Sequence, residues 1–361
     1  MSRGAGTRPR CVPDLWFAVP GDLATRTGGY IYDRRLLAEL RGLGWSVEHL
    51  AWGASFPFPD AADLAAAAGS LAGVADGGRV LIDGLAYGAM PAAATAAAGR
   101  LRLVALVHHP LARETGLTAA QQASLLRSER IALRAARAVI CTSATTAGVL
   151  AADYGIPPER ITVALPGTDA VSAGRARTPA ADGVVRLLSV GTVTPRKGHD
   201  LLVEALARIA DRRWTCIIAG SLDRDPAMVA EVRRRIAAHG LGERIALVGE
   251  VADLADLYGQ ADVFVLPSRY EGYGMAFAEA LQQGLPVIGT ATGAIPEVVP
   301  ASAGILVPVD DPAALTAALG RLLSDPGARR RLAAGAALAA KALPRWAETA
   351  QRVAALLQAI G

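Results

Sequence analysis

The sequence contains little cysteine and no long apolar run. Its three cysteines, Cys11, Cys141 and Cys216, match neither the spacing of a zinc site nor a disulfide framework, which predicts unpaired thiols in a reducing compartment. No apolar run approaches the roughly 18 residues of a membrane-spanning helix. Residues 1–13 carry three arginines without a following apolar stretch, so we expect a flexible tail and no secretory signal. These absences predict a cytoplasmic protein and leave open peripheral binding at the inner face of a membrane.

Two further absences concern ligands. Lys and Arg are not massed in one block and the net charge is only +4, which does not favour nucleic-acid binding and suits a small anionic ligand. The pattern GxGxxG is missing, which counts against a dinucleotide-binding dehydrogenase. The histidines outside the pair His108 and His109 fall in separate expected elements. We therefore expect no metal site and no cofactor.

What the sequence does contain is a regular alternation of short strands and longer helices. Its 361 residues, 52% apolar and 19% charged, suffice for two domains of roughly 150 to 200 residues each. Alternation of this kind predicts parallel sheets with helices on both faces. Strands are expected at residues 15–19, 47–50, 80–83, 103–107, 139–142 and 161–165, and again near 185–190, 215–219, 245–248, 263–266, 286–288 and 305–307.

We therefore predict an α/β fold of two tandem Rossmann-like, doubly wound domains that face each other across a cleft. Residues 171–184, rich in Gly, Ala, Pro and Thr, are the expected linker between a first domain at 14–170 and a second at 185–343. The helical residues 344–361 follow Pro344, and we expect them to cross back to the first domain. Open parallel sheets bind ligands beyond the carboxyl ends of their strands, so functional residues should directly follow strands.

Arg196 and Lys197 follow an expected strand in "LLSVGTVTPRKGHDLL", after a turn that contains Gly191. Two cations at that place would neutralise a diphosphate through charge-assisted hydrogen bonds of about 1.5 to 3 kcal/mol each. A solvated pair on a loop is the plain alternative, and the position after a strand counts against it.

Two glutamates flank a glycine-bearing turn in "EGYGMAFAEA", which also follows a strand. Eight helical steps would leave Glu271 and Glu279 on different faces, so we expect Glu271 in the loop and Glu279 in a helix that starts around Gly274. The first amides of that helix would form an anion seat. Dipole compensation or capping is the alternative role of a glutamate near a helix start.

The first domain has weaker signals. Gly28 and Gly29 precede a helix, where backbone amides can approach a phosphate, although a plain turn explains them equally. His108 and His109 end a strand, and adjacent strand residues point in opposite directions, so at most one would face a ligand. A D-x-D pattern at Asp223–Asp225 could hold a metal, but its position before Pro226 favours a helix cap.

A row of arginines marks the expected helix at 119–137. Such a basic face could contact anionic lipid, but no Trp or Phe accompanies it, which favours a solvated helix face. The row consists of Arg127, Arg130, Arg134 and Arg137.

Nearly the whole chain resembles glycosyltransferase family 4, through "TGGYIYDRRLLAEL", "VGTVTPRKG" and "LYGQADVFVLPSRYEGYGMAFAEALQQGLPVIGTATGAIPEVV". The resemblance implies a GT-B fold and a retaining, metal-independent transfer of a hexose from a nucleotide-diphosphate sugar to an acceptor hydroxyl. The first domain would bind the acceptor, and the second would bind the donor. The acceptor, whether a small molecule, a glycan or a lipid-linked sugar, and the donor base and sugar stay open.

The same resemblance implies roles for individual residues. Glu271 would contact hydroxyls of the transferred sugar, Glu279 the ribose, and Arg196 with Lys197 the diphosphate. A histidine after the fourth strand would lie at the reacting centre. His108 fits this place better than His109, although the doubled histidine leaves the choice open. The donor-binding set would comprise Gly28, Gly29, Gly191, Arg196, Lys197, Glu271, Gly272, Gly274, Met275, Ala276 and Glu279.

A nonhydrolysing sugar-nucleotide epimerase shares the two-domain architecture and is the alternative function. It would need acid and base carboxylates in the cleft of the first domain, and Asp83 and Glu114 are the obvious candidates there.

Overall fold

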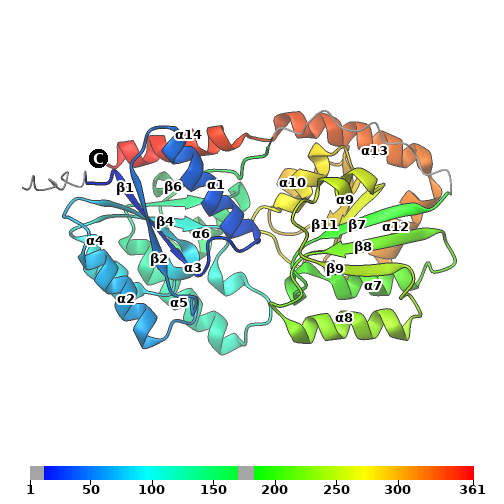
Figure 1. Ribbon diagram of the computed structural model, residues 1–361, viewed down its shortest axis with the longest axis horizontal. Coiled ribbons are helices and arrows are strands. Elements are labelled where there is room, and N and C mark those ends of the chain that lie inside the picture. Colours follow the sequence, from blue (N-terminus) through cyan, green and yellow to red (C-terminus); the bar gives the residue numbers. More distant parts are fainter. Residues whose placement is uncertain (1–11, 170–182) are drawn as a thin grey trace, which may run out of the picture.

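The computed structural model describes residues 12–169 and 183–361 and contains two six-stranded sheets, each with helices on both faces (Figure 1). Every strand pairing in both sheets is parallel. The predicted fold class, two tandem Rossmann-like domains, is confirmed. Most of the expected tail at 1–13 and of the expected linker at 171–184 lies outside the described residues.

The first sheet has the strand order β2-β1-β3-β4-β5-β6. Alternate residues of β1 point to opposite faces, because Trp16 joins one apolar cluster and Phe17 another. The order reverses between β1 and β3, which places the ligand crevice of this domain at the carboxyl ends of those strands. The strands are β1 (Leu15–Pro20), β2 (Val47–Trp52), β3 (Arg79–Asp83), β4 (Arg102–Val107), β5 (Ala138–Cys141) and β6 (Ile161–Val163).

Except for the first, the helices of the first domain begin at side-chain caps or at proline. The helix expected near 88–98 starts at Pro91, which lacks an N–H, and a short helix capped by Asp83 precedes it. The helices are α1 (Gly28–Gly42), α2 (Ala61–Ala72), α3 (Gly84–Tyr87), α4 (Pro91–Ala98), α5 (Ala119–Ala135) and α6 (Ala144–Tyr154).

The second sheet has the order β12-β11-β10-β7-β8-β9, which reverses between β7 and β10. Val263 to Leu266 in β10 are fully enclosed, as expected for the centre of a parallel sheet. The strands are β7 (Val185–Val190), β8 (Trp214–Ala219), β9 (Ile245–Gly249), β10 (Val263–Leu266), β11 (Val287–Thr290) and β12 (Gly304–Val307).

The helices of the second domain include the one that follows the D-x-D pattern. The Asp225 carboxylate accepts the Met228 backbone N–H at 2.9 Å, and Pro226 is the first helical residue, so the predicted cap is confirmed. The helices are α7 (His199–Ala207), α8 (Pro226–Ala238), α9 (Ala255–Gln260), α10 (Met275–Gln282), α11 (Ile295–Val298), α12 (Pro312–Ser324) and α13 (Pro326–Ala339).

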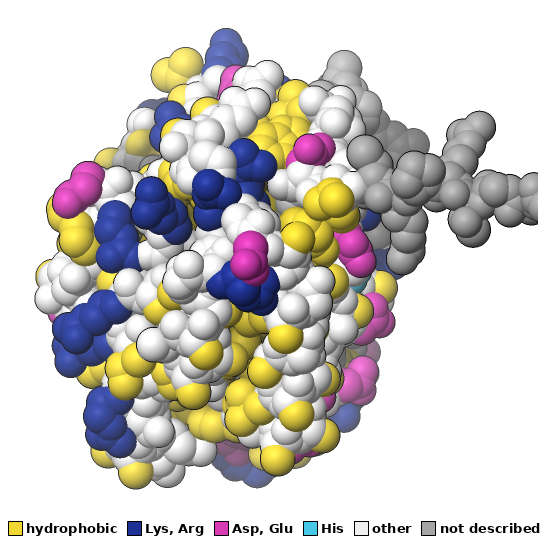
Figure 2. All heavy atoms as spheres, turned by 90° about the vertical axis from the view of Figure 1, so that its left-hand side faces the viewer, with side chains coloured by type: hydrophobic (Ala, Val, Ile, Leu, Met, Phe, Trp, Pro, Cys, Tyr) yellow, Lys and Arg dark blue, Asp and Glu magenta, His cyan; other side chains and the backbone are white. Residues whose placement is uncertain are grey.

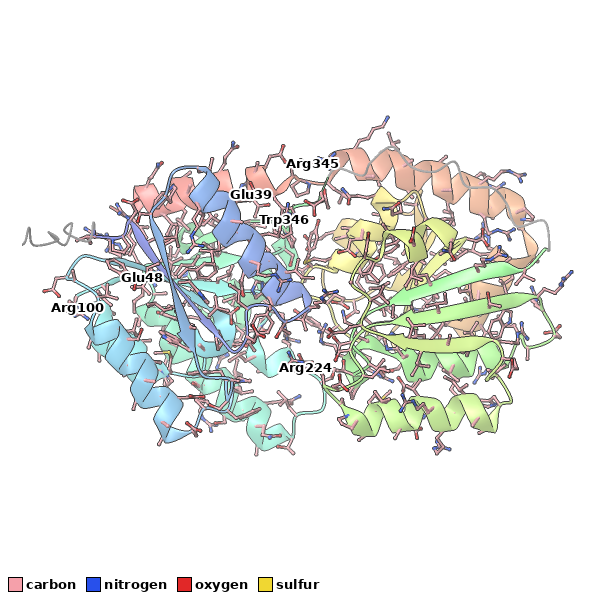
Figure 3. The ribbon with its side chains drawn as sticks, in the orientation of Figure 1. Glu39, Glu48, Arg100, Arg224, Arg345 and Trp346 are labelled. Carbon is pink, nitrogen blue, oxygen red and sulfur yellow. The ribbon has the colours of Figure 1, made fainter. Side chains whose placement is uncertain are left out.

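The last helix, α14 (Trp346–Ala359), lies against the first domain (Figure 1). Trp346, labelled in Figure 3, packs edge-on against Tyr32 of α1 with 5.6 Å between ring centroids. The hydroxyl of Thr168 donates to the Pro344 carbonyl at 2.9 Å, just before the helix starts. The chain therefore returns to the first domain beside Thr168, near the end of the first-domain segment.

Candidate active site

The carboxyl ends of the two sheets meet at Gly272, where the backbones of the two domains come close together. A Cβ atom on Gly272 would lie 2.1 Å from the His108 carbonyl oxygen and 3.0 Å from the His109 Cβ, so only glycine permits this approach. Gly272 follows β10, and His108 follows β4. The residues that follow these strands therefore line the same space between the domains.

Glu271 lies at the centre of a charged cluster in the second domain. Its Oε1 accepts from Lys197 Nζ at 2.6 Å and from the Ser268 hydroxyl at 2.6 Å, and its Oε2 accepts from Arg196 at 3.2 Å. Arg196 and Lys197 follow β7 and Glu271 follows β10, the two strands at which the sheet order reverses. The structure thus brings Glu271 to two adjacent residues that precede it in the sequence by 75 and 74 positions.

The two cations keep the Glu271 carboxylate ionised. Burial alone would raise the pKa of Glu271, which is 5% exposed, but Lys197 and Arg196 outweigh burial and hold the pKa at about 2. Burial lowers the pKa of Lys197, and the carboxylate opposes that shift. Glu271 thus holds two cations side by side after β7, and a second carboxylate, Glu114 of the first domain, approaches Arg196 from across the domain boundary.

Two glycines shape the turn that carries these cations. Gly198 has a positive φ of 69°, and a Cβ atom on it would lie 2.1 Å from the Pro267 carbonyl oxygen. A Cβ atom on Gly191 would lie 3.2 Å from Cδ of Lys197. The lysine stem therefore lies directly over the turn that ends β7.

Helix α10 starts where the sequence predicts. Gly274 forms its N-cap with φ of 98°, and a Cβ atom on Gly28 of α1 would lie 3.6 Å from the Met275 sulfur. The amino end of α1 thus contacts the amino end of α10 across the cleft. Both ends direct positive partial charge into the same region.

Glu279 lies on α10 and is bound from the neighbouring helix α9. Its Oε2 accepts from the Tyr258 hydroxyl at 2.8 Å, and that hydroxyl also approaches the Ala276 carbonyl at 3.3 Å. Burial raises the pKa of Glu279. Within the described residues the other carboxylate oxygen has no hydrogen-bond partner, which leaves it available to a ligand hydroxyl.

His108 and His109 diverge, as expected for adjacent residues at the end of a strand. His108 Nε2 lies 3.1 Å from carboxylate oxygens of both Asp33 and Asp83. His109 Nε2 lies 3.2 Å from Glu114, whose other oxygen lies 3.2 Å from Nε of Arg196. His109 is thus linked through Glu114 to the cation cluster of the second domain, and His108 is held within the first.

Asp33 is a site residue that the sequence reasoning missed. It lies on α1, four residues after Gly29, and a Cβ atom on Gly29 would lie 3.2 Å from the His108 ring. A spacing of four residues on a helix puts both positions on one face. That periodicity was the available signal, because a glycine facing the cleft implies that Asp33 faces it too.

Asp33, Asp83 and His108 are the one group of potential metal ligands whose ligand atoms all lie within 4.8 Å of one another in the described ranges. The direct contacts between Nε2 and both carboxylates account for this arrangement as a hydrogen-bonded ion cluster. Each of these residues already has a partner, so the geometry does not require an ion.

Of the predicted arginine row, Arg127, Arg130 and Arg134 lie on α5, whereas Arg137 follows the end of that helix at Ala135. Figure 2 shows Lys and Arg side chains spread over the end of the first domain, separated by apolar and uncharged groups. Arg127, Arg134 and Arg137 are exposed, whereas half-buried Arg130 donates to the Asp153 carbonyl at 2.7 Å.

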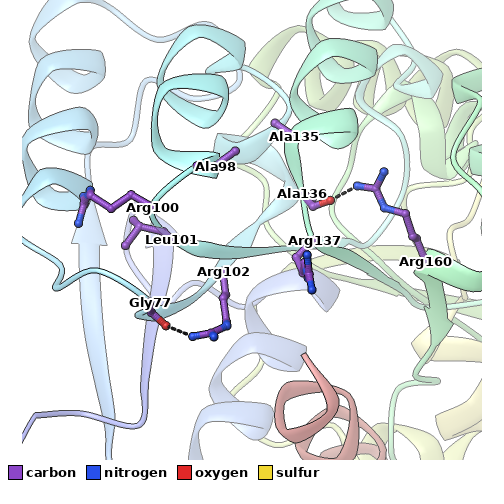
Figure 4. Close-up of a pocket in the computed structure, with 10 residues that line it drawn as sticks. Gly77, Ala98, Arg100, Leu101, Arg102, Ala135, Ala136, Arg137 and Arg160 are labelled. Carbon is purple, nitrogen blue, oxygen red and sulfur yellow. Dashed lines mark hydrogen bonds between the residues drawn. The ribbon is translucent and has the colours of Figure 1, made fainter. Parts of the chain in front are cut away.

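A hollow of about 700 Å³ lies at the amino ends of the strands of the first sheet. Four arginines line it, and Figure 4 shows Arg160 bonded to the Ala136 carbonyl and Arg102 to the Gly77 carbonyl. Arg160 thereby caps the carboxyl end of α5, which is a structural role. The hollow is on the side of the sheet opposite the cleft.

Known families account for both halves of this arrangement. Residues 81–171 match the family described as Glycosyltransferase Family 4, and residues 185–325 match Glycosyl transferases group 1. The chain belongs to glycosyltransferase family 4. The two matched segments contain all the residues of the charged clusters except Asp33.

Curated relatives resemble this chain in sequence, and solved structures resemble it in fold. The D-inositol 3-phosphate glycosyltransferase of Xylanimonas cellulosilytica is 32% identical over 66% of this chain and 62% of its own length. The chain thus spans less than two thirds of that relative. Sucrose-phosphate synthase from Thermosynechococcus elongatus covers 96% of the chain and 98% of its own, at a TM-score of 0.80 and 23% identity.

Anabaena Alr3699/HepE, solved in complex with UDP-glucose, has a TM-score of 0.76 at 19% identity and covers 96% of this chain and 99% of its own. These structural similarities confirm the GT-B arrangement of two Rossmann-like domains. Among the helices described, none is both long and apolar enough to cross a membrane.

Proposed function

We propose that the protein is a retaining glycosyltransferase that moves a hexose from a nucleotide-diphosphate sugar to an acceptor hydroxyl without a metal ion. The observation that carries this proposal is the convergence of Arg196, Lys197 and Glu271 at the point where the strand order of the second sheet reverses. That point is where doubly wound sheets bind nucleotides.

The charge of the site suits the departing group. Cleavage of the bond between the sugar and the diphosphate leaves an anion, and preorganised cations at the place where that charge develops lower the barrier. Arg196, Lys197 and the amino end of α10 supply positive charge there, which is the role that a divalent cation plays in metal-dependent transferases. Glu271 keeps the two cations in place and offers acceptor oxygens to sugar hydroxyls.

The nucleotide would extend along α10. Glu279, half-buried with one unpartnered oxygen, lies about one turn beyond the start of α10, and that oxygen would accept from ribose hydroxyls. UDP-glucose in the Anabaena structure supports a donor of the uridine diphosphate class for the fold. The D-inositol 3-phosphate glycosyltransferase relative supports a hydroxylated acceptor of small size.

The family match does not favour the epimerase alternative, and neither does the geometry. Asp83 is 2% exposed and bonded to His108, and Glu114 bridges His109 and Arg196. Neither carboxylate is a free acid or base on an open cleft wall.

A donor panel tests the proposal directly. The protein is incubated with UDP-, GDP- and ADP-sugars, with thermal unfolding, released nucleotide and epimerised donor measured in parallel. A bound donor at 100 times its Kd stabilises the fold by about 2.7 kcal/mol. We expect stabilisation by one base class, nucleotide release with an acceptor, and the same rate in EDTA. An epimerised donor without nucleotide release, or no stabilisation by any nucleotide, would contradict the proposal.

The configuration of the product tests retention separately. The coupling constant of the anomeric proton of the transferred sugar is measured by NMR during the first turnovers. Retention predicts the configuration of the donor, and the opposite anomer would assign an inverting mechanism.

A further inference from the structure

Two buried carboxylates from different elements hold one nitrogen of His108. Asp33 belongs to α1 and is 1% exposed, and Asp83 ends β3 and is 2% exposed. Each has an oxygen 3.1 Å from Nε2. One N–H hydrogen therefore faces two acceptors, which fixes the orientation of the ring and places a proton on Nε2.

The remaining oxygens of the two carboxylates differ in their partners. Oδ1 of Asp83 accepts the Leu85 N–H at 2.9 Å and caps α3. Oδ2 of Asp33 is buried without a hydrogen-bond partner in the described part of the chain. A buried carboxylate that is only partly satisfied costs free energy unless a nearby positive charge offsets the loss. The group at hydrogen-bond distance that can carry this charge is His108.

Other charged and titratable groups around this cluster lie further out. Burial and Asp83 raise the pKa of Asp33 to about 7, against the lowering effects of His108 and of Arg34, the next residue on α1. Tyr30 and Tyr32 of α1 have raised pKa values, first through burial, and stay neutral. From the second domain, the backbone of Gly272 comes close to the His108 carbonyl. Asp33 and Asp83 thus dominate the field at the ring.

The ring also has a free side. Every polar contact of the His108 side chain within the described ranges uses Nε2, which leaves Nδ1 for a ligand. Packing restricts the ring further, because its centroid lies 5.2 Å from that of Tyr32 and a Cβ atom on Gly29 would lie 3.2 Å from its Cδ2. Burial would lower the pKa of His108, but the two carboxylates raise it to about 10.

We propose that Asp33 and Asp83 are positioning residues that hold His108 as an imidazolium, whose Nδ1–H donates a charge-assisted hydrogen bond to an oxygen of the bound nucleotide sugar. This inference rests on the proposed function, since it names how that site fixes one of its donors. A preorganised charged donor needs no reorientation during the reaction and binds an oxygen more strongly than a neutral imidazole does.

The first test needs no substrate. Protein labelled with ¹⁵N-histidine is titrated from pH 6 to pH 9 by NMR, and the His108→Gln variant assigns the His108 ring signals. We expect an imidazolium at pH 8 in the wild type. In the double variant Asp33→Asn, Asp83→Asn the ring should be neutral at that pH, because its pKa falls from about 10 toward the ordinary value of about 6.5. A neutral ring in the wild type at pH 8 would overturn the proposal even if transfer activity is absent.

The second test uses the dependence of kcat on pH, once a donor is known. Wild-type kcat should stay level up to pH 9, and kcat of the Asp83→Asn and Asp33→Asn variants should fall above about pH 7, close to the ordinary histidine pKa. Asp76→Asn removes an exposed carboxylate of the same domain and should leave the profile unchanged. Thermal unfolding of every variant checks the fold.

Two outcomes would contradict a positioning role. Lower activity with an unchanged pH profile in the Asn variants would reduce Asp33 and Asp83 to structural residues. Loss of activity in EDTA with recovery in Mg²⁺ or Mn²⁺, abolished by either Asn substitution, would assign the three side chains to a metal instead.

Discussion

The two charged clusters of the cleft have opposite compositions. In the second domain a single carboxylate, Glu271, lies between two cations, and its pKa falls to about 2. In the first domain a single histidine lies between two carboxylates, and its pKa rises to about 10. In both clusters two oppositely charged neighbours keep the central side chain in its charged form, although burial favours the neutral form.

The clusters differ in the sign of the groups that surround the central one. Arg196 and Lys197 surround Glu271 in the second domain, and Asp33 and Asp83 surround His108 in the first. Under the proposed function the two cations would stabilise the anionic leaving group as the bond breaks. The variants below test whether the two sides are complementary.

The largest expected effect is that of Glu271→Gln on turnover. The change keeps the volume but removes the charge that orients Arg196 and Lys197, so we expect kcat to fall by about 10²- to 10³-fold, the scale of losing one preorganised group. Because two partly buried cations lose their partner, unfolding should also become easier by about 3 kcal/mol. Steady-state kinetics and urea unfolding measure the two effects. Glu243→Gln, an exposed glutamate of the same domain, is the control; wild-type kinetics of Glu271→Gln would remove this residue from the site.

Acid should weaken the second domain through Glu271. Its pKa in the folded protein is about 2, below the ordinary value of about 4.5, so the stabilisation is present above pH 4.5 and is lost as the pH falls toward 2. The shift corresponds to about 3 kcal/mol. Urea unfolding of the wild type and Glu271→Gln at pH 7 and pH 3 measures this loss. The two proteins should differ less at pH 3 than at pH 7, and an equal difference at both values would argue against the lowered pKa.

A smaller effect is expected at the distal end of α10. Tyr258→Phe removes the hydroxyl that orients Glu279, at a cost of about 1 kcal/mol for one hydrogen bond. We expect a severalfold higher KM for the donor with little change in kcat, because the contact would act on the nucleotide and not on the reacting bond. Tyr273→Phe removes another buried tyrosine hydroxyl of this domain and serves as the matched control. A lowered kcat at unchanged KM would place Glu279 at the reacting centre instead.

The smallest effect is expected outside both clusters. Arg137 is exposed at the hollow on the far side of the first sheet, so Arg137→Ala should change the free energy of unfolding by less than about 0.5 kcal/mol. Donor binding and turnover should also be unchanged. A clear loss of activity would show that the cleft is not the only functional region.

Much of the fold was predictable because its signals are local. The strands and most helices follow from periodicity, and Asp225 with Pro226 marks a helix start without reference to the rest of the chain. The short helix α3 was missed, because its 4 residues after Asp83 are too few to show a helical period. Arg196, Lys197 and Glu271 were recognised in the sequence, but nothing in it indicated that they bond to one another.

Local order along the chain therefore determined the two parallel sheets, the helix starts and the placement of charged residues directly after strands. Tertiary structure alone decided that Asp33, which is 75 residues from His108, shares its ring nitrogen with Asp83, and that Glu114 meets Arg196 across the cleft. The physical reason is that periodicity reports which face a residue occupies, whereas strand order and the docking of two domains determine which faces meet. The pKa of a side chain depends on which charged groups it contacts, so the fold decided the charge states of the site.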